Sequence, residues 1–207
     1  MTTKKYAEYL SYPKVPDEIL YSPERIVNLP LVEYGGAAAK AGIRSGESRK
    51  IYSQRRVGPE LKEWLLQTFD FPFTSYYMIC TDLLKSHTDF RKVAINYFVD
   101  LGGDDIYTES YDREFIEGDQ DRWANFRKNA GLETTFDTHT TNTPIQVITS
   151  EIVPLHQWVK YDTSIPHGTI GNIVRPRIFL SVIPHADIPI PQNPDWASTV
   201  IYWRDNW

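Results

Sequence analysis

The stretch Ile173–Val182 reads IVRPRIFLSV and has the alternating pattern of a β-strand with two different faces. Successive side chains of a strand point to opposite sides of the sheet. One face would carry the apolar side chains of Val174, Ile178, Leu180 and Val182. The other face would carry Arg175, Arg177, Phe179 and Ser181. The stretch therefore predicts a strand that packs on a core on one side and presents arginines on the other.

Further runs of β-branched and aromatic residues share this strand-like character. They cover residues 75–84, 93–101, 145–153 and 157–161, and the strand around Ile173 extends to residue 183. Pro59–Phe69 has a helical pattern instead, with proline in the first turn and apolar side chains at Leu61, Trp64 and Leu65. Short strands punctuated by proline and glycine favour a sandwich or barrel with one helix packed on a sheet.

The length of 207 residues is typical of a single domain, 1–207. Residues 1–58 contain four prolines and a patch of small residues, so we expect an irregular arm that wraps a core. The core is expected over residues 59–183 and includes a polar, acidic insertion at 107–142, where 122–127 could form a short helix. Residues 184–207 form a tail rich in proline and tryptophan, whose aromatic side chains favour packing or a contact in a homo-oligomer.

The composition argues against several classes of protein. With 22 basic and 27 acidic residues the net charge is -5, so we expect no nucleic-acid groove that neutralises phosphates. No apolar run is long enough for a membrane span, and the N-terminal residues lack the apolar stretch of a signal peptide. The single cysteine, Cys80, cannot form an internal disulfide and fits a reducing, cytoplasmic compartment.

Two histidines stand in a His-x-Asp frame, His87 with Asp89 and His185 with Asp187. Because positions i and i+2 of a strand point to the same face, such a tripeptide can offer an imidazole and a carboxylate to one metal ion. A site with two histidines and one carboxylate needs another histidine farther along the chain. His167 follows the first frame and no histidine follows the second, so the second frame is expected to be a coincidence at the surface.

Arg177 follows His167 by ten residues. A buried arginine needs an anion, and its planar guanidinium suits a carboxylate bound at two points. On the strand after a metal-binding histidine, an inward arginine would lie close enough to hold the far carboxylate of a ligand that chelates the metal.

The combination of His87-x-Asp89, His167 after a proline, and Arg177 resembles the iron(II)- and 2-oxoglutarate-dependent oxygenases. The local sequences HTDFRKVAINYF, from His87, and YDTSIPH, ending at His167, are similar to small prolyl-hydroxylase-like members from bacteria and tailed phages. The resemblance covers about residues 70–183 and leaves the arm and the tail without a counterpart. For a phage protein, the expected compartment becomes the host cytoplasm.

The resemblance implies a mainly β fold, a double-stranded β-helix of the jelly-roll or cupin-like kind. His87, Asp89 and His167 would be the catalytic metal ligands and would hold Fe(II). 2-Oxoglutarate would chelate the iron, and Arg177 would pair with its 5-carboxylate. The implied reaction releases succinate and carbon dioxide and hydroxylates a small molecule or peptide that the sequence does not identify.

One position departs from the family pattern. Many members have a serine two residues after the arginine, whereas this chain has Phe179. A second hydrogen bond to the 5-carboxylate would then come from elsewhere, and Asn96 and Tyr77 are the candidates. Arg175 shares the expected face of Arg177, although the ten-residue spacing favours Arg177.

The sequence also leaves open two other classes of function. A non-catalytic β-helix, used as a binding or virion-associated module, would keep the barrel without oxidising anything. A cupin-like metal enzyme such as an isomerase would bind metal without needing 2-oxoglutarate.

Overall fold

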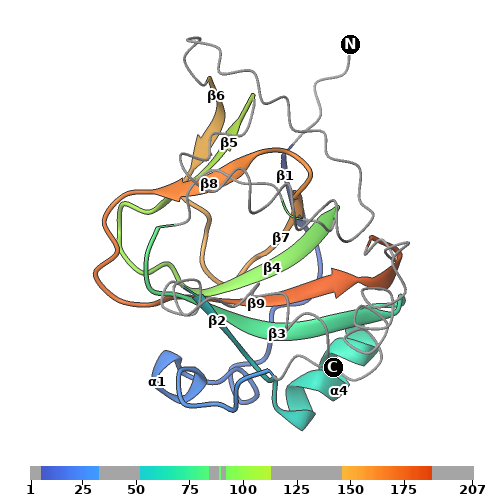
Figure 1. Cartoon of the computed structure of the whole chain (residues 1–207). Helices are drawn as coiled ribbons and strands as arrows, with labels where there is room; N and C mark the ends of the chain where they lie inside the picture. The colour runs from blue at the N-terminus through green and yellow to red at the C-terminus, as the bar shows by residue number, and fades with distance from the viewer. Residues whose placement is uncertain (1–5, 33–51, 84–88, 90–91, 113–145, 188–207) are drawn as a thin grey trace, which may run out of the picture.

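The computed structural model describes residues 6–32, 52–83, 89, 92–112 and 146–187. Within these residues the chain is mainly β, with two antiparallel sheets, two α-helices and a short 3-10 turn at His185–Asp187. The smaller sheet lies above the larger one in Figure 1, and both helices lie below the larger sheet. None of the described helices has the length and apolar character needed to cross a membrane.

The larger sheet has six strands in the order β1-β7-β4-β9-β3-β2, and neighbouring strands are antiparallel. Their bounds, from edge to edge, are β1 (Ala7–Leu10), β7 (Trp158–Asp162), β4 (Val93–Asp100), β9 (Arg177–Pro184), β3 (Phe73–Cys80) and β2 (Tyr52–Arg55). Every residue of the central strand β9 is buried, because other parts of the chain cover both faces of the sheet.

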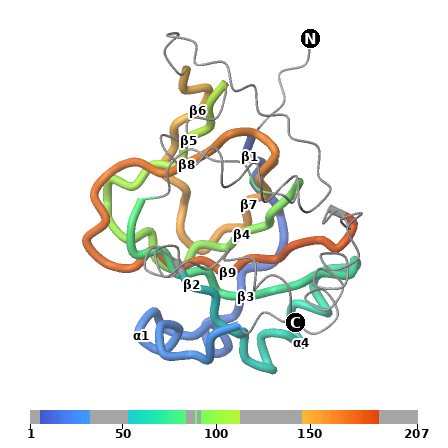
Figure 2. Tube along the Cα trace, in the orientation of Figure 1, coloured from blue at the N-terminus to red at the C-terminus, as the bar shows by residue number. Residues whose placement is uncertain are grey.

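The smaller sheet has three antiparallel strands in the order β6-β5-β8. Their bounds are β6 (Val147–Glu151), β5 (Tyr107–Tyr111) and β8 (His167–Ile170). After β4 the chain forms β5 and β6 in the smaller sheet, β7 in the larger sheet, β8 in the smaller sheet and β9 in the larger sheet, as the tube in Figure 2 shows. This alternation brings residues of the two sheets together although they lie far apart in the sequence.

The main hydrophobic core lies between the six-stranded sheet and its two helices, α1 (Pro23–Ile26) and α4 (Pro59–Thr68). Helix α4 begins at Pro59, whose fixed φ suits the first helical position, and it buries Leu61 and Leu65, which are four residues apart. These side chains pack against one face of the sheet, which includes Ile178 and Leu180 of β9. The predicted apolar face therefore packs on the helices at Ile178, Leu180 and Val182, whereas Val174, which precedes β9, is 65% exposed.

The N-terminal residues differ from the irregular arm that the sequence predicts. The described part contains β1, α1 and β2, and the two strands extend the six-stranded sheet at its opposite edges. The indole Nε1 of Trp158 donates a hydrogen bond of 2.9 Å to the carbonyl of Pro13, which ties the segment to β7. Short strands at sheet edges depend on pairing with distant residues, and this explains why local sequence did not reveal them.

The helix at 59–69 and the strands around 75–84, 93–101, 145–153 and 157–161 are confirmed within a few residues. Strand β9 begins at Arg177 rather than at residue 173, after Pro176. Strand β5 falls in the stretch interpreted as an insertion, so this interpretation was wrong for Tyr107–Tyr111. The short helix expected at 122–127 and the tail from residue 188 onwards lie outside the described residues.

Candidate anion and metal site between the two sheets

Arg177, the first residue of β9, is a buried cation between the two sheets, with 4% of its surface exposed. Its Nη2 donates a hydrogen bond of 2.7 Å to the Thr108 hydroxyl on β5, and its guanidinium lies 4.9 Å from the centre of the Phe98 ring. Its Nε is buried and donates no hydrogen bond to any described atom. Burial lowers the pKa of Arg177, because the charged form is desolvated. A bound anion would stabilise a buried guanidinium in this environment.

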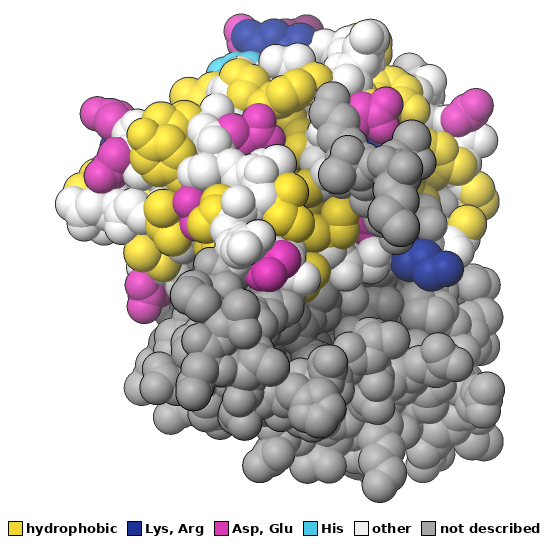
Figure 3. All heavy atoms as spheres, turned by 90° about the horizontal axis from the view of Figure 1, so that it is seen from above, with side chains coloured by type: hydrophobic (Ala, Val, Ile, Leu, Met, Phe, Trp, Pro, Cys, Tyr) yellow, Lys and Arg dark blue, Asp and Glu magenta, His cyan; other side chains and the backbone are white. Residues whose placement is uncertain are grey.

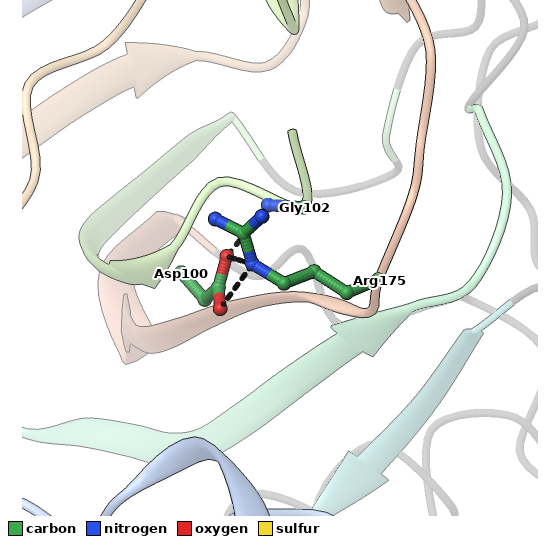
Figure 4. Close-up of polar contacts among 3 residues, drawn as sticks. All are labelled: Asp100, Gly102 and Arg175. Atoms are coloured by element: carbon green, nitrogen blue, oxygen red, sulfur yellow. Dashed lines mark hydrogen bonds and ion pairs between the residues drawn. The ribbon is translucent and has the colours of Figure 1, made fainter. Parts of the chain in front are cut away.

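Arg175 is in a different situation, although the sequence placed both arginines on one face. It precedes β9, its side chain is half exposed, and its Nε lies 3.0 and 2.9 Å from the two carboxylate oxygens of Asp100 (Figure 4). The backbone N–H of Gly102 also donates to Asp100, at 2.8 Å. The charge of Arg175 is thus compensated at the surface, and Arg177 is the arginine available to a ligand.

Glycine at position 102 allows the loop after β4 to pass closely against Arg177. Its φ of 84° lies in the left-handed region that favours glycine. A Cβ atom here would lie 3.0 Å from both the Cβ of Arg177 and the carbonyl oxygen of Arg175. The loop therefore fixes the start of β9 and, with it, the backbone from which the Arg177 side chain extends.

His167, the first residue of β8, is held in one orientation by its backbone surroundings. Its Nδ1 lies 2.8 Å from the carbonyl oxygen of Ile165. Because a carbonyl only accepts, Nδ1 carries the proton, and Nε2 is then the unprotonated nitrogen of a neutral ring. This is the arrangement found at metal-binding histidines, whose second nitrogen donates to a carbonyl or carboxylate.

Asp89 lies near the same place. Its backbone N–H donates a hydrogen bond of 3.0 Å to the carbonyl of Thr163, which directly follows β7, and Asp89 is half-buried. Burial is the main cause of the raised pKa of Tyr6, and the charge of Asp89 raises it further. The ring of Tyr6 packs on His167 with 5.5 Å between ring centres. The third expected ligand, His87, lies outside the described residues, and the described ones alone bring no three His, Cys, Asp or Glu side chains together.

The two additional co-substrate residues suggested by the sequence lie away from Arg177. Asn96 shares the inner face of the six-stranded sheet, but its Oδ1 accepts a 2.7 Å hydrogen bond from Ser181, four residues along β9 from Arg177. Four strand residues span about 13 Å. Tyr77 pairs with Leu180 and belongs to the core on the opposite face, towards α4. The structure thus brings neither side chain to the guanidinium.

Three residues outside the set expected from the sequence interact with Arg177 instead. Thr108 accepts a hydrogen bond from it, while burial raises the pKa values of Tyr6 and Tyr161 and the charge of Arg177 acts in the opposite direction. Burial outweighs this effect, so the pKa of each tyrosine is raised and both hydroxyls stay protonated. Thr108 alternates with polar neighbours in a stretch read as an insertion, and Tyr6 lies in the expected arm, so neither had a distinctive local pattern.

The face of the three-stranded sheet that points towards Arg177 is polar throughout. The strand register places six side chains on it, from Thr108, Ser110, Thr149, Glu151, His167 and Thr169. The Ser110 and Thr149 hydroxyls hydrogen-bond to each other at 2.7 Å, and Thr108 bonds to Arg177. Inner faces of a β-sandwich core are normally apolar. A polar face opposite a buried arginine is typical of a ligand site rather than of a core.

The second histidine frame lies elsewhere. The Nε2 of His185 is 3.0 Å from the Thr74 hydroxyl, at the end of β9 farthest from Arg177. His185 is half-buried rather than a free surface residue, and its imidazole is engaged by the six-stranded sheet.

The surface seen from above shows acidic side chains scattered among apolar ones (Figure 3). In the described part of this face, Lys and Arg side chains appear only near its margins.

Comparisons with known proteins give distant structural similarity only. No family model and no curated protein matches the sequence. Among solved structures, AviO1 from Streptomyces viridochromogenes Tue57 aligns with 14% identity and a TM-score of 0.34, covering 68% of this chain and 70% of that one. HygX from Streptomyces hygroscopicus, crystallised with nickel and 2-oxoglutarate, aligns with 11% identity and a TM-score of 0.33, over 78% and 76% of the two chains. The apo form of HygX gives 9% identity and a TM-score of 0.35, over 84% and 88%. Similarity at this level carries no argument about the fold or function of this chain.

Proposed function

We propose that the protein is an Fe(II)- and 2-oxoglutarate-dependent oxygenase that hydroxylates a small molecule or peptide. The observation that carries the proposal is Arg177, a buried guanidinium without a carboxylate partner among the described residues, ten residues after His167. A dicarboxylate that reaches from a metal ion to this arginine would supply the missing anion. His167, with Nδ1 bonded to Ile165, and the neighbouring Asp89 are suitable protein ligands for that metal.

The connectivity of the strands supports a double-stranded β-helix for this proposal. A jelly roll has eight strands in two sheets. Here β7, β4, β9 and β3 are consecutive neighbours in the larger sheet, and β6, β5 and β8 form the smaller one. Residues 84–88 and 90–91, between β3 and β4, lie outside the described part.

The protein's own groups would act by binding and orientation. Arg177 would hold the far carboxylate of 2-oxoglutarate, and the Thr108 hydroxyl, which accepts from Nη2, keeps its own hydrogen to donate to that carboxylate. Thr108 would thus replace the family serine absent at Phe179. His87, Asp89 and His167 would hold the iron. The chemistry supplied with iron and 2-oxoglutarate bound is oxidative decarboxylation to succinate and carbon dioxide, coupled to hydroxylation of the substrate.

Binding and turnover measurements test this proposal. The whole chain is titrated with Co(II) or Ni(II) and then with 2-oxoglutarate, and iron with 2-oxoglutarate is examined without oxygen for a visible absorption band. Arg177→Ala should weaken 2-oxoglutarate binding at least about 30-fold, since it removes one partner of a buried charge pair. His87→Ala and Asp89→Ala should abolish succinate formation. Arg175→Ala is the matched control and should bind 2-oxoglutarate like the wild type, because Asp100 already pairs with Arg175.

Two other outcomes of these binding measurements would favour the alternative classes of function. A wild-type protein that binds neither metal nor 2-oxoglutarate would indicate a non-catalytic binding or virion-associated module. Metal binding that is insensitive to 2-oxoglutarate would indicate a cupin-like metal enzyme. Unchanged succinate formation in His87→Ala would also contradict the assignment.

A further inference from the structure

The outer face of the three-stranded sheet, opposite its polar inner face, carries large apolar side chains that are accessible. Tyr107 of β5 pairs with Ile170 of β8, and the two residues are 37% and 43% exposed. Ile152 directly follows Glu151, which ends β6 and pairs with Thr108. Ile152 thus lies at the same end of the sheet, and it is 42% exposed. These three side chains form an apolar row across that end of the face.

The opposite end of the outer face is apolar as well. Val147 of β6 pairs with Tyr111, and both Val147 and its neighbour Ile148 are more than half exposed. Most of the exposed large apolar side chains in the described part of the chain belong to the three strands or to the loops beside them: Tyr107, Val147, Ile148, Ile152, Leu155, Ile170 and Val174. Single exposed apolar residues are ordinary, but a concentration of them on one face is typical of an interaction surface.

The same part of the molecule carries negative charge only. Residues 101–112, 146–156 and 163–174 contain the three strands and no lysine or arginine. Asp104 and Asp105 are exposed and precede β5 at the end where Tyr107 lies, and the exposed Asp112 follows β5 at the other end. Carboxylates therefore flank both apolar ends of the outer face.

A further carboxylate, that of Glu109, lies at the centre of the face. Because Thr108 and Ser110 point to the interior, Glu109 between them belongs to the outer side. Its two carboxylate oxygens accept hydrogen bonds from the hydroxyls of Tyr111, at 3.0 Å, and Ser150, at 2.8 Å. Both donors are neutral, so within the described residues these bonds orient the carboxylate without adding a positive charge beside it.

Charge complementarity selects the kind of partner. Figure 3 views the molecule from the side of the smaller sheet and shows acidic side chains among the apolar ones. Such a face repels anionic lipids and nucleic acids. A second copy that docked through the same face would place carboxylates against carboxylates. A polypeptide that presents lysine or arginine beside apolar side chains complements both the charge and the apolar surface.

We propose that the outer face of the three-stranded sheet is a docking surface for a basic polypeptide segment with apolar side chains beside its cationic ones. The apolar side chains of the partner would cover Tyr107, Ile152 and Ile170, and its cationic groups would lie near Asp104, Asp105 and Asp112. This inference is independent of the proposed function, since the face points away from Arg177 and His167.

The test measures, by fluorescence anisotropy, how a labelled synthetic peptide of alternating lysine and isoleucine binds to the full chain. Two further peptides, with glutamate in place of lysine or serine in place of isoleucine, separate the contributions of charge and apolar surface. The double variant Tyr107→Thr with Ile170→Thr removes apolar side chains and keeps residues that suit exposed strands. Leu66→Gln is its control, because Leu66 is 61% exposed on α4, on the other side of the molecule.

A second pair of variants tests the charge. Asp104→Asn with Asp112→Asn removes two exposed carboxylates from the ends of the face. Glu63→Gln with Asp70→Asn makes the same change in net charge on and just after α4, and serves as the control. Circular dichroism of every variant checks that the fold is retained.

The lysine–isoleucine peptide should bind the wild type at least about tenfold more tightly than either of the other peptides, and more weakly as salt is raised. Each variant of the outer face should lose at least about fivefold in affinity, and each control should stay within about twofold of the wild type. A wild type that does not bind this peptide, equal binding of the glutamate peptide, or face variants that bind like their controls would each overturn the inference. Dimerisation in analytical ultracentrifugation, or binding to phosphatidylcholine vesicles, that is lost in Tyr107→Thr with Ile170→Thr would also overturn it, by assigning the face to a second copy or to a membrane.

Discussion

Arg177 is a buried cation that destabilises the ligand-free fold, and this indicates a role in ligand binding. Its guanidinium is buried, one nitrogen donates to a neutral hydroxyl, and another donates to no described atom. An unpaired charge in such a place destabilises a fold, and proteins retain such charges mainly where a ligand needs them. The ten-residue spacing from His167 selected this arginine over Arg175 from sequence alone. The contact with Thr108 could not be predicted, because it depends on how the two sheets face each other.

Arg177→Met should therefore make the ligand-free protein more stable. Methionine has a similar length and removes the desolvated charge, so we expect the melting temperature to rise by about 2–4 °C, equivalent to roughly 1 kcal/mol for a chain of this size. Differential scanning fluorimetry without added metal or 2-oxoglutarate measures this effect. Arg175→Met at the half-exposed position serves as the control. A lower melting temperature for Arg177→Met would mean that the arginine stabilises the fold through a partner in the chain.

At the scale of elements, strands with a strong local pattern were predictable and those without it were not. β4 and β9 consist of nearly continuous apolar residues, and α4 has a proline start and a regular apolar spacing. By contrast, β5 and β8 combine hydroxyl, charged and glycine residues, because one of their faces lines the polar space next to Arg177. A strand that lines a ligand site lacks the alternation that reveals a strand packed on a core.

The six-stranded sheet separates the core on its outer face from the candidate site on its inner face. Leu65 of α4 is fully buried in that core, across the sheet from Arg177. Leu65→Ala should lower the free energy of unfolding by about 2–5 kcal/mol, because it leaves a cavity, while 2-oxoglutarate affinity should remain unchanged. Chemical denaturation and calorimetry measure the two quantities. Leu66→Ala is the neighbouring control, since 61% of Leu66 is exposed. A large loss of ligand affinity in Leu65→Ala would show that the two faces of the sheet are coupled.

At the scale of the whole molecule, tyrosines with raised pKa values set a limit on stability at high pH. Burial raises the pKa of Tyr9, Tyr97 and Tyr111 to about 12 each, and hydrogen bonds to Glu151 and Glu109 contribute at Tyr9 and Tyr111. In the unfolded chain a tyrosine titrates near 10. Between these values the unfolded state loses protons that the folded state keeps, so stability falls as the pH rises.

Melting temperatures should therefore be nearly constant from pH 7 to 9 and fall progressively between pH 10 and 12. Thermal unfolding followed by circular dichroism at each pH measures this, and absorbance at 295 nm shows whether the tyrosines ionise together with unfolding. Ionisation of all 13 tyrosines near pH 10 without unfolding would contradict the raised pKa values.

Because the N-terminal segment is hydrogen-bonded to β7, removing this segment would remove contacts of the domain. A fragment trimmed to residues 59–183 would retain His87, Asp89, His167 and Arg177 and would look complete by any search for those residues. It would nevertheless lose Tyr6, the Pro13 carbonyl that binds Trp158, and the buried Ile26. The smallest unit that keeps both the core and the candidate site is thus longer than the segment that carries the recognisable motif. Relatives of this chain with different N-terminal segments would need other residues to complete the core and the candidate site.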